Sequence, residues 1–400
     1  MTSKSRKLLS LGVTSVLFSI FAVSANAQNL EWATQAGGLS NESGRGIAVD
    51  DDGNSYVTGF FFGTAHFGAG GTAASLISLG NSDIFIAKYD DNGDLLWAKQ
   101  AGGLMGEAGL GIAVDDDGKS YVTGAFTGTA TFGASEFNET TLVSNAWNDI
   151  FIAKYDSSGN LEWAKQAGNP TATFANDEGL GIAVDGSNNS YVTGYFNGTA
   201  TFGEADAAIV LTGAGEDDIF IAKYDGDGNL VWAEQAGGDS SDEGLGIAVD
   251  GLGNSYVTGQ FQGSATFGEE ITEVTLDTGS SFDRNIFIAK YDGSGDLVWA
   301  EQAGGDSSDE GLGIAVDGLG NSYVTGQFQG SATFGTTELT GAINGGMFIA
   351  KFDSSGIAVW AEQAGGMTGS ATGVGIAAND AGDSYVGGNL AAQPPSAAPS

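Results

Sequence analysis

Four apolar patterns recur in a fixed order along the chain, and each predicts a β-strand. In order they are Gly-Ile-Ala, Ser-Tyr-Val, Phe-Ile-Ala-Lys and Trp-Ala-x-Gln-Ala-Gly. Each lies in a short run rich in Ile, Val, Tyr, Phe or Trp, with Gly, Asn and Asp at its ends, as strands have. The first and third runs are continuously apolar instead of alternating, which indicates strands covered on both faces of their sheet.

The patterns repeat with a period of 61 to 69 residues. The fourth pattern marks the period through its tryptophans, which are Trp32, Trp97, Trp163, Trp232, Trp299 and Trp360. Residues 231–268 and 298–335 are identical, so one duplication is recent. Self-similarity at a fixed period is the signature of a repeat architecture.

Two short connections fix how the strands pair. Residues 50–56 join the first strand to the second, and residues 90–95 join the third to the fourth. Both carry the Asp and Gly that tight hairpins require, because Asp caps its own turn and Gly takes the positive φ. Four antiparallel strands repeated in this way predict an all-β protein, a β-propeller of four-stranded antiparallel blades. The absence of a 3.6-residue apolar period excludes a helical solenoid, and a β-helix stacks shorter coils than this repeat.

The phase of the repeat predicts how the propeller closes. The chain after residue 27 begins with a Trp strand at residues 30–35, continues through five complete blades, and ends with a first and a second strand at 376–378 and 385–387. These terminal strands predict a composite sixth blade closed by both ends of the chain. That blade lacks its Phe-Ile-Ala-Lys strand, so either it has three strands or the chain belongs to a longer protein.

The two ends of the chain differ from the repeats. Lys4, Arg6 and Lys7 precede an apolar run at residues 8–24 and the small-residue pattern Ala25-Asn26-Ala27, which together predict a signal peptide over residues 1–27. The repeats then occupy residues 28–390, and residues 391–400, rich in Pro, Ala and Ser, predict a flexible tail. We therefore expect an exported protein, located outside the cell, on its surface or in the periplasm.

Charge and cysteine content narrow the possible partners. The chain has 50 acidic and 13 basic residues, a formal charge of −37, and no Cys. Such a field repels nucleic acid and anionic membranes and attracts cations or basic partners. The lack of Cys excludes disulfides, thiol catalysis and thiolate metal sites. We expect no nucleic-acid partner, no membrane insertion and a monomer.

The combination of patterns resembles a known family. Gly-Ile-Ala-Val-Asp-x-x-Gly-Asn-Ser-Tyr-Val-Thr-Gly, then Phe-x-Gly-x-Ala-x-Phe-Gly, then Phe-Ile-Ala-Lys-Tyr-Asp-x-x-Gly-x-Leu-x-Trp, is similar to the SBBP repeat, named for a seven-bladed β-propeller. The resemblance covers residues 30 to 388. It implies a module of exported bacterial proteins and brings no catalytic motif with it. The five blades plus a composite sixth depart from the number in the family's name.

Few side chains are candidates for chemistry. The only histidine, His66, stands where other copies have Thr, and no nucleophile accompanies it. The repeated Trp and Tyr predict packing between blades, and the Lys of the third pattern predicts a pair with a neighbouring carboxylate. We therefore predict no enzyme activity and no required cofactor.

Two features fit binding better. An acid precedes each first strand, five residues before its Ile, at Glu42, Glu107, Asp177, Asp242 and Asp309, with Ala371 in the composite blade. In a closed ring these acids would surround one face, where a cation or basic partner could bind, although capped turns and solubility also explain them. The long, variable connections between second and third strands, at 68–83, 133–149 and 203–218, emerge on the same face, and one of them carries Trp147, suited to stacking on a sugar or to packing on its own blade.

Calcium is the plausible metal. The Asp-rich turns resemble oxygen-rich loops without the full twelve-residue ligand spacing. The candidate ligands are Asp50, Asp52, Asp115, Asp117, Asp225 and Asp227. Taken together, the sequence predicts an exported, non-catalytic binding module for a protein or a polysaccharide. The alternatives are an extracellular polysaccharide hydrolase or lyase and a passive spacer in a surface protein.

Overall fold

The computed structural model describes residues 32–144, 147–169, 175–269, 272–365, 369–379 and 381–392. These residues are almost entirely β, with two single-turn 3-10 helices, η1 (Gly70–Thr72) and η2 (Ala205–Ala207). The predicted signal peptide lies outside the described residues, and so does most of the predicted tail. Residues 391 and 392 end the last strand, so the fold extends two residues beyond the boundary expected from composition.

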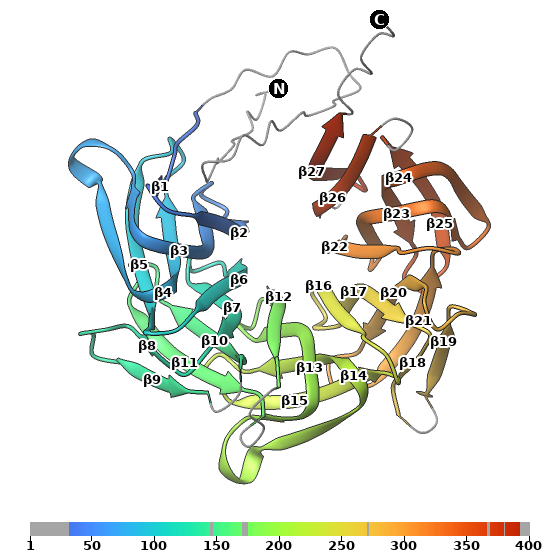
Figure 1. The fold of residues 1–400 in the computed structure, drawn as a ribbon, viewed down its shortest axis with the longest axis horizontal. Coiled ribbons are helices and arrows are strands. Elements are labelled where there is room, and N and C mark those ends of the chain that lie inside the picture. The colour runs from blue at the N-terminus through green and yellow to red at the C-terminus, as the bar shows by residue number, and fades with distance from the viewer. Residues whose placement is uncertain are drawn as a thin grey trace, which may run out of the picture. The chain divides into compact units, whose positions relative to one another are not determined.

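Five groups of four antiparallel strands follow one another along the chain (Figure 1), and short additional strands extend the first of these sheets to seven strands and the third to six. The first three are β2-β3-β4-β5 (Glu42–Val49, Ser55–Phe67, Ala74–Tyr89, Leu95–Gly103), β6-β7-β10-β11 (Glu107–Val114, Ser120–Phe126, Asp149–Tyr155, Leu161–Ala167) and β12-β13-β14-β15 (Glu178–Val184, Ser190–Phe202, Ile209–Tyr224, Leu230–Gly237). The next two are β16-β17-β20-β21 (Glu243–Val249, Ser255–Gln262, Arg284–Tyr291, Leu297–Ala303) and β22-β23-β24-β25 (Glu310–Val316, Ser322–Phe334, Thr337–Phe352, Ala358–Ala364). A two-stranded sheet of β26 (Gly369–Ala378) and β27 (Ser384–Ala392) comes last.

The strand order within a sheet is the one that the turn chemistry predicts. In the first sheet Ile47 is opposite Val57, Val57 is opposite Ala87, and Ala87 is opposite Ala98, all antiparallel. The tight turns have the predicted conformation, with Gly53 at φ 81° and Gly93 at φ 84°. The all-β, antiparallel, propeller-like repeat is therefore confirmed.

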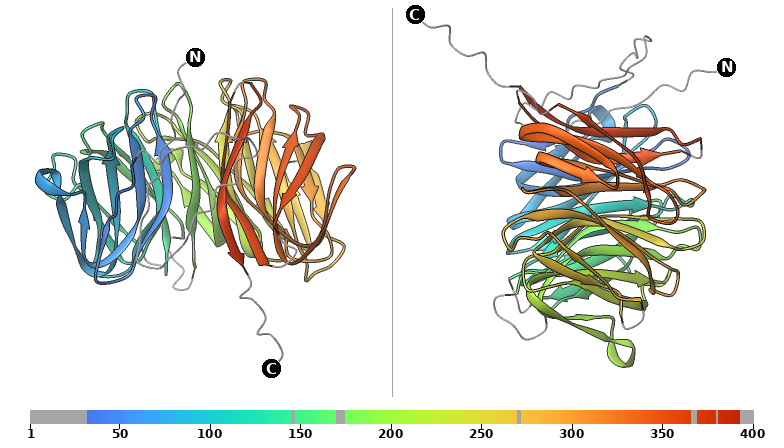
Figure 2. Two further views of the ribbon diagram at one scale, coloured as in Figure 1. Left: turned by 90° about the horizontal axis from the view of Figure 1, so that it is seen from above. Right: turned by 90° about the vertical axis from the view of Figure 1, so that its right-hand side faces the viewer.

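The described chain forms two compact units. One comprises residues 32–212 and 220–233, and the other comprises residues 213–219 and 234–392. In the first unit β2, β6 and β12 lie side by side, and in the second unit β16, β22 and β26 do so. Figure 2 shows the same strands from two further directions.

The connection from the second to the third strand is a β-hairpin and not a loop. β3 runs on to Phe67 and β4 already begins at Ala74. In the second and fourth repeats the same hairpin forms separate strands, β8 (Thr129–Phe132) with β9 (Thr140–Val143), and β18 (Ser264–Phe267) with β19 (Val274–Asp277). The reason is that the Phe-x-Gly-x-Ala-x-Phe-Gly segment keeps a period of two, which places Phe61, Ala65 and Phe67 in the core.

Each hairpin also pairs with the sheet that precedes it. Gly102, at the end of β5, is opposite Thr131 of the next hairpin, and Gly237, at the end of β15, is opposite Thr266. Before the first sheet, β1 (Gly37–Gly38) pairs in the same way with His66 and Ala65. Main-chain hydrogen bonds therefore cross from one repeat to the next.

The hydrophobic core lies between successive sheets. In one cluster Tyr56, Ile84 and Ile86 of the first sheet pack with Val122 and Phe151 of the second. Both faces of the inner strands are thus covered, as their continuous apolar runs predicted.

The predicted N-terminal Trp strand is not formed in the described part of the chain. Residues 32–36 have no strand pairing, and residues 30 and 31 lie outside the description. In the complete sheets the Trp strand pairs with the Phe-Ile-Ala-Lys strand, as Trp97 does with Lys88. The incomplete repeat has no such strand, so its Trp segment lacks the neighbour that would define it as a strand.

Candidate functional site

The junction between consecutive repeats brings together most of the residues that the sequence singled out. The lysine of the third pattern lies over the tyrosine ring of the second, at 4.7 to 5.0 Å from the ring centroid in all five complete repeats. Tyr56 lies directly opposite Lys88, and this cross-strand register explains the contact. Sequence reasoning missed this cation–π pair, although the pairing of second and third strands held the signal.

The tyrosine and tryptophan connect one repeat to the next. The Tyr56 hydroxyl donates to the carbonyl of Gly118 in the following repeat (2.9 Å) and lies 3.1 Å from Asp50 Oδ2. The Trp97 ring packs edge-on against Tyr56, with centroids 6.2 Å apart. These aromatic residues therefore have the packing role that the sequence predicts.

The predicted lysine–carboxylate pairs are present at three repeats. Lys88 Nζ lies 3.8 Å from Asp50 Oδ2, and Lys351 Nζ lies 3.8 Å from Asp317 Oδ2. Lys154 instead lies 3.3 Å from Glu162 Oε2. Because these lysines are mostly buried, the pairs compensate charge inside the junction and do not present it to a partner.

The turn acids considered as calcium ligands use their oxygens within their own turns. Asp50, Asp115 and Asp225 each accept, through Oδ1, the backbone N–H four residues later, at 2.8 to 2.9 Å. Burial raises the pKa of Asp50 and Asp225, but hydrogen bonds, above all from Asn54 and Asn229, outweigh burial and hold each pKa below its usual value. Asp52, Asp117 and Asp227 are exposed on the same turns. Across the described ranges, no group of three or more His, Cys, Asp or Glu side chains is placed to hold a metal ion.

The acids that precede each first strand, hereafter the leading acids, lie inside the junction. Glu107, Asp177, Asp242 and Asp309 are buried, and only Glu42 is partly exposed. Asp242 accepts N–H groups from Gly238 (2.7 Å), in the preceding repeat, and from Gln262 (2.9 Å), in its own hairpin. Burial raises the pKa of Glu107 and of Asp242 to about 7. The leading acids thus hydrogen-bond two repeats to each other. They therefore do not form the solvent-exposed ring of acids that the sequence suggested.

Of the two other singled-out residues, His66 lies on a hairpin and Trp147 lies between β9 and β10. His66 is on β3, exposed, with Nδ1 2.8 Å from Ser75 Oγ. Trp147 is 60% exposed, and its backbone N–H donates to the Ala175 carbonyl (3.1 Å). The structure therefore exposes much of Trp147, which is one of the two placements that the sequence left open.

Exposed apolar side chains gather at the first hairpin. Ile77 and Leu79 project from β4, and Leu104 and Met105 follow the end of β5. The Met105 carbonyl accepts the N–H of Asn81 (3.1 Å), which holds these two segments together. We call these four residues the apolar hairpin patch. At the position of Leu104, later repeats have Asp239 and Asp306.

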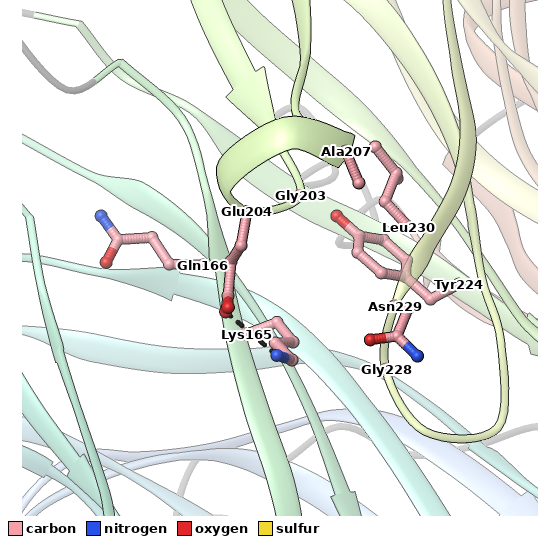
Figure 3. Close-up of a pocket in the computed structure, with 9 residues that line it drawn as sticks. All are labelled: Lys165, Gln166, Gly203, Glu204, Ala207, Tyr224, Gly228, Asn229 and Leu230. Carbon is pink, nitrogen blue, oxygen red and sulfur yellow. Dashed lines mark hydrogen bonds and ion pairs between the residues drawn. The ribbon is translucent and has the colours of Figure 1, made fainter.

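Cavities in the first unit lie between neighbouring repeats. One of about 60 Å³, lined by Lys165, Glu204 and Tyr224 among others, is closed on one side by an ion pair of 3.0 Å (Figure 3). A groove of about 480 Å³ runs between Ile77, Leu79, Lys99 and Glu136. Only the groove reaches the size of small-molecule sites, and it borders the apolar hairpin patch.

The sheets, the hairpin turns and the repeated junctions define a protein of β-propeller repeats. Four segments, residues 31–59, 162–199, 231–260 and 298–327, match the SBBP family, described as a beta-propeller repeat, so the resemblance inferred from the sequence is confirmed and the chain carries SBBP repeats.

Two curated proteins are similar to the chain. An uncharacterized WD repeat-containing protein of Acanthamoeba polyphaga mimivirus is 26% identical over 333 residues, covering 71% of this chain and 24% of that protein. The regulatory protein FlaEY of Caulobacter vibrioides is 31% identical over 113 residues, covering 28% of this chain and 12% of that protein. The chain thus spans a quarter or less of the length of these relatives.

One solved structure, a protein of unknown function from Bacteroides caccae, matches 70% of this chain and 90% of its own, with 11% identity and a TM-score of 0.31. That likeness is too low to support an argument. No helix of the described residues is long and apolar enough to cross a membrane.

Proposed function

We propose that the protein is an exported, non-catalytic interaction module that binds a protein partner through its hairpins. The observation that carries the proposal is the apolar hairpin patch. Leu79 is 66% exposed and Leu104 is 78% exposed, on segments joined by a hydrogen bond and next to a groove. The repeats are most alike at their junctions. A binding site, in contrast, requires a feature that only one repeat has. Grouped exposed apolar side chains with a polar surround are typical of protein interfaces.

The similarity to a WD repeat-containing protein supports an interaction role and names no partner. The buried positions of the leading acids and of the repeated lysines assign those charges to the scaffold. Variable hairpins on a rigid repeat are then the remaining place for specificity.

The test compares two double variants of residues 28–400. Leu79→Ser with Leu104→Ser removes the patch, and Leu252→Ser with Leu319→Ser removes two equally exposed leucines from hairpin turns. Each is immobilised and exposed to surface proteins of the producing organism and to an array of bacterial and algal polysaccharides. We expect the patch variant to lose at least tenfold in capture of one protein, while the control retains it. Equal capture by both variants would show that the patch is not the binding site. Selective glycan binding would instead indicate that the ligand is a polysaccharide and that Trp147 is the residue to test.

We also propose that the repeats form six blades, the sixth composed of both chain ends. Trp32 Nε1 donates to the Asp91 carbonyl (3.1 Å), as Trp97 Nε1 does to Ser157, so Trp32 takes the place of a preceding blade's Trp on the first sheet. In the first unit Ile47 is 58% exposed, although its equivalents in the four later four-stranded repeats are buried, and in the second unit Tyr385 is 42% exposed. Each would be covered in a closed ring.

A disulfide tests closure, because the chain has no Cys of its own. Ile47→Cys with Tyr385→Cys should oxidise readily if the blades close. Ile47→Cys with Leu252→Cys serves as the mismatched control. Absence of an intramolecular disulfide in the first pair would contradict the closed ring.

A further inference from the structure

Three repeat junctions bury two carboxyl groups against each other. The first comes from the residue that opens the third-strand pattern, and the second is the leading acid of the next repeat. The pairs are Asp83 with Glu107, Asp149 with Asp177, and Asp218 with Asp242, all buried. At the first junction Asp83 Oδ2 and Glu107 Oε2 both lie 2.9 Å from the point that a Cβ on Gly102 would occupy. Two ionised carboxylates this close, out of water, repel each other strongly.

The hydrogen bonds of the two members differ most clearly at the second junction, since at the first junction Glu107 accepts only the N–H of Gly103 and its Oε1 also lacks a donor in the described structure. Asp177 accepts backbone N–H groups with both oxygens, from Asn169 and Asn197 at 2.9 Å, and Asp242 does the same with Gly238 and Gln262. Two backbone donors stabilise an ionised carboxylate. Asp83 accepts from Gln100 Nε2 through Oδ2 (2.7 Å), but its Oδ1 is buried and has no donor in the described structure. Asp149 repeats this arrangement, with Gln166 on Oδ2 (2.6 Å) and Oδ1 likewise unsatisfied among the described residues.

The fourth repeat shows which group belongs at that oxygen. Asn285 stands where the others have Asp. With its amide in the orientation that satisfies its neighbours, its oxygen accepts from Gln302 Nε2 (3.1 Å) and its Nδ2 donates to the Gly305 carbonyl (3.1 Å). Gly305 is the counterpart of Gly103. All hydrogen bonds at this position are therefore made when the atom facing the backbone carbonyl carries a hydrogen. An aspartic acid supplies that hydrogen only when it is protonated.

The strand acid, the one that opens the third-strand pattern, occurs only where a leading acid follows it. Asn285 faces a single carboxyl, Asp309, which accepts from Gly305 and Gln329. In the fifth repeat the strand residue is Gly346 and the leading position is Ala371, so both carboxyls are gone. No third-strand pattern precedes Glu42 in the sequence, so Glu42 has no strand acid to pair with. Both of its oxygens lack a hydrogen-bond partner in the described structure. A leading acid is therefore kept without the strand acid, but no strand acid is found without a leading acid.

We propose that each of these three carboxyl pairs holds one proton in the folded protein, carried by Asp83 and Asp149 at the first two junctions, so that the junctions tighten in acid and loosen as the pH rises. The proton on Asp83 and on Asp149 is donated from Oδ1 to the backbone carbonyl of residues 103 and 169, as Asn285 donates to Gly305. The ionised partner keeps its backbone donors.

The surrounding charges act in the same direction. The charge that acts on Glu107 is Asp83, and those that act on Asp218 and Asp242 include Asp217, all of them carboxylates. Burial raises the pKa of Asp149 and of Asp218 to about 6 and raises that of Asp83 as well. Since these groups ionise near pH 4 when unfolded, folding takes up protons between about pH 4 and 7, and stability falls as the pH rises through that window.

The experiment uses residues 28–400 and copies the natural substitution. The triple variant Asp83→Asn, Asp149→Asn, Asp218→Asn should match the wild type in Tm at pH 5 and exceed it at pH 8. The reverse change, Asn285→Asp, should lower the Tm at pH 8 and leave it nearly unchanged at pH 5. Asp116→Asn, at an exposed position of a turn, is the matched control and should shift neither value.

A direct measurement accompanies the melting curves. At pH 5.5 exposed carboxyls are ionised, so the infrared C=O band of protonated carboxyls should be present in the folded wild type and weaker in the triple variant. Two results would overturn the proposal. One is a triple variant that is less stable than the wild type at pH 8 and has a band as strong as that of the wild type. The other is a calcium-dependent rise in wild-type Tm at pH 8 that the triple variant loses, which would make the pairs cation sites.

Discussion

The indole nitrogen of Trp97 donates to the carbonyl oxygen of Ser157 at 3.2 Å, across sixty residues of sequence. The same bond joins Trp299 to Ser354. The last strand of one repeat is therefore hydrogen-bonded to the third hairpin turn of the next, where Gly159 leaves room for the ring. One residue type thus fixes both the packing and the spacing of successive repeats.

Replacing Trp299 by Phe should lower the free energy of unfolding by about 1 kcal/mol, because the ring remains while the bond to Ser354 is lost. Trp299→Ala should cost about 3 to 5 kcal/mol, since it also leaves a cavity against Tyr256. Urea unfolding monitored by circular dichroism measures both. Phe282→Ala, at an exposed position, is the control and should stay within about 0.5 kcal/mol of the wild type. Equal losses for the Phe and Ala variants would show that the hydrogen bond alone matters.

Gly102→Ala should destabilise the first junction by more than about 2 kcal/mol. Its φ is 155°, and an added Cβ would lie 2.7 Å from Asp83 Cγ. Gly186→Ala is the matched control, because no atom lies within 4 Å of its Cβ position. The control should be neutral or slightly stabilising. A thermal melt of both variants decides, and similar Tm values for the two would contradict the close approach.

Asp250→Ala should lower stability at pH 7 by about 2 kcal/mol and much less at pH 2. Burial raises the pKa of Asp250, but hydrogen bonds from Asn254 first, and from Leu252 and Tyr256, bring it below its usual value. A lowered folded-state pKa stabilises the protein above about pH 4, and this stabilisation is lost as the pH falls through the folded pKa. Melting curves of wild type and variant from pH 2 to 7 should converge in acid. Parallel curves would mean that ionised Asp250 contributes nothing.

Calcium should leave the Tm at pH 6 unchanged, and EDTA should have no effect there. The turn carboxylates of Asp50, Asp115 and Asp225 already accept backbone N–H groups, so a calcium ion would have to displace them. Isothermal calorimetry of residues 28–400 provides the second readout. If calcium binds and Asp225→Asn with Asp227→Asn abolishes the binding, the turns are metal sites after all.

The sequence predicts the strands and their pairing because both depend on local patterns. Asp50 and Gly53 fix a turn, and the apolar runs fix the strands on either side. The hairpin between the second and third strands was expected to be a loop, since its return strand varies between copies, although Phe61, Ala65 and Phe67 hold a period of two.

The site was harder to predict from sequence. Glu107 and Asp242 carry no local sign of burial, and their environment arises only when Asp83 and Asp218 come from the preceding repeat. Each of these carboxyls is desolvated by a contact with a residue that lies 24 positions earlier in the sequence, so its neighbours in sequence do not reveal the burial. For Trp147 the sequence left surface exposure and packing on its own blade equally open, and the structure exposes 60% of the residue.

The hairpin that crosses each junction has a consequence for how this chain can evolve. The two identical segments, 231–268 and 298–335, begin in the last strand of one repeat and end where the next hairpin turns back. Divergence between the copies starts at the returning arm, where one copy is six residues longer. The hairpin tips can therefore change in sequence and length in one repeat at a time, which can alter binding specificity. The junctions between repeats keep the same sequence, so a duplicated repeat still fits its neighbours.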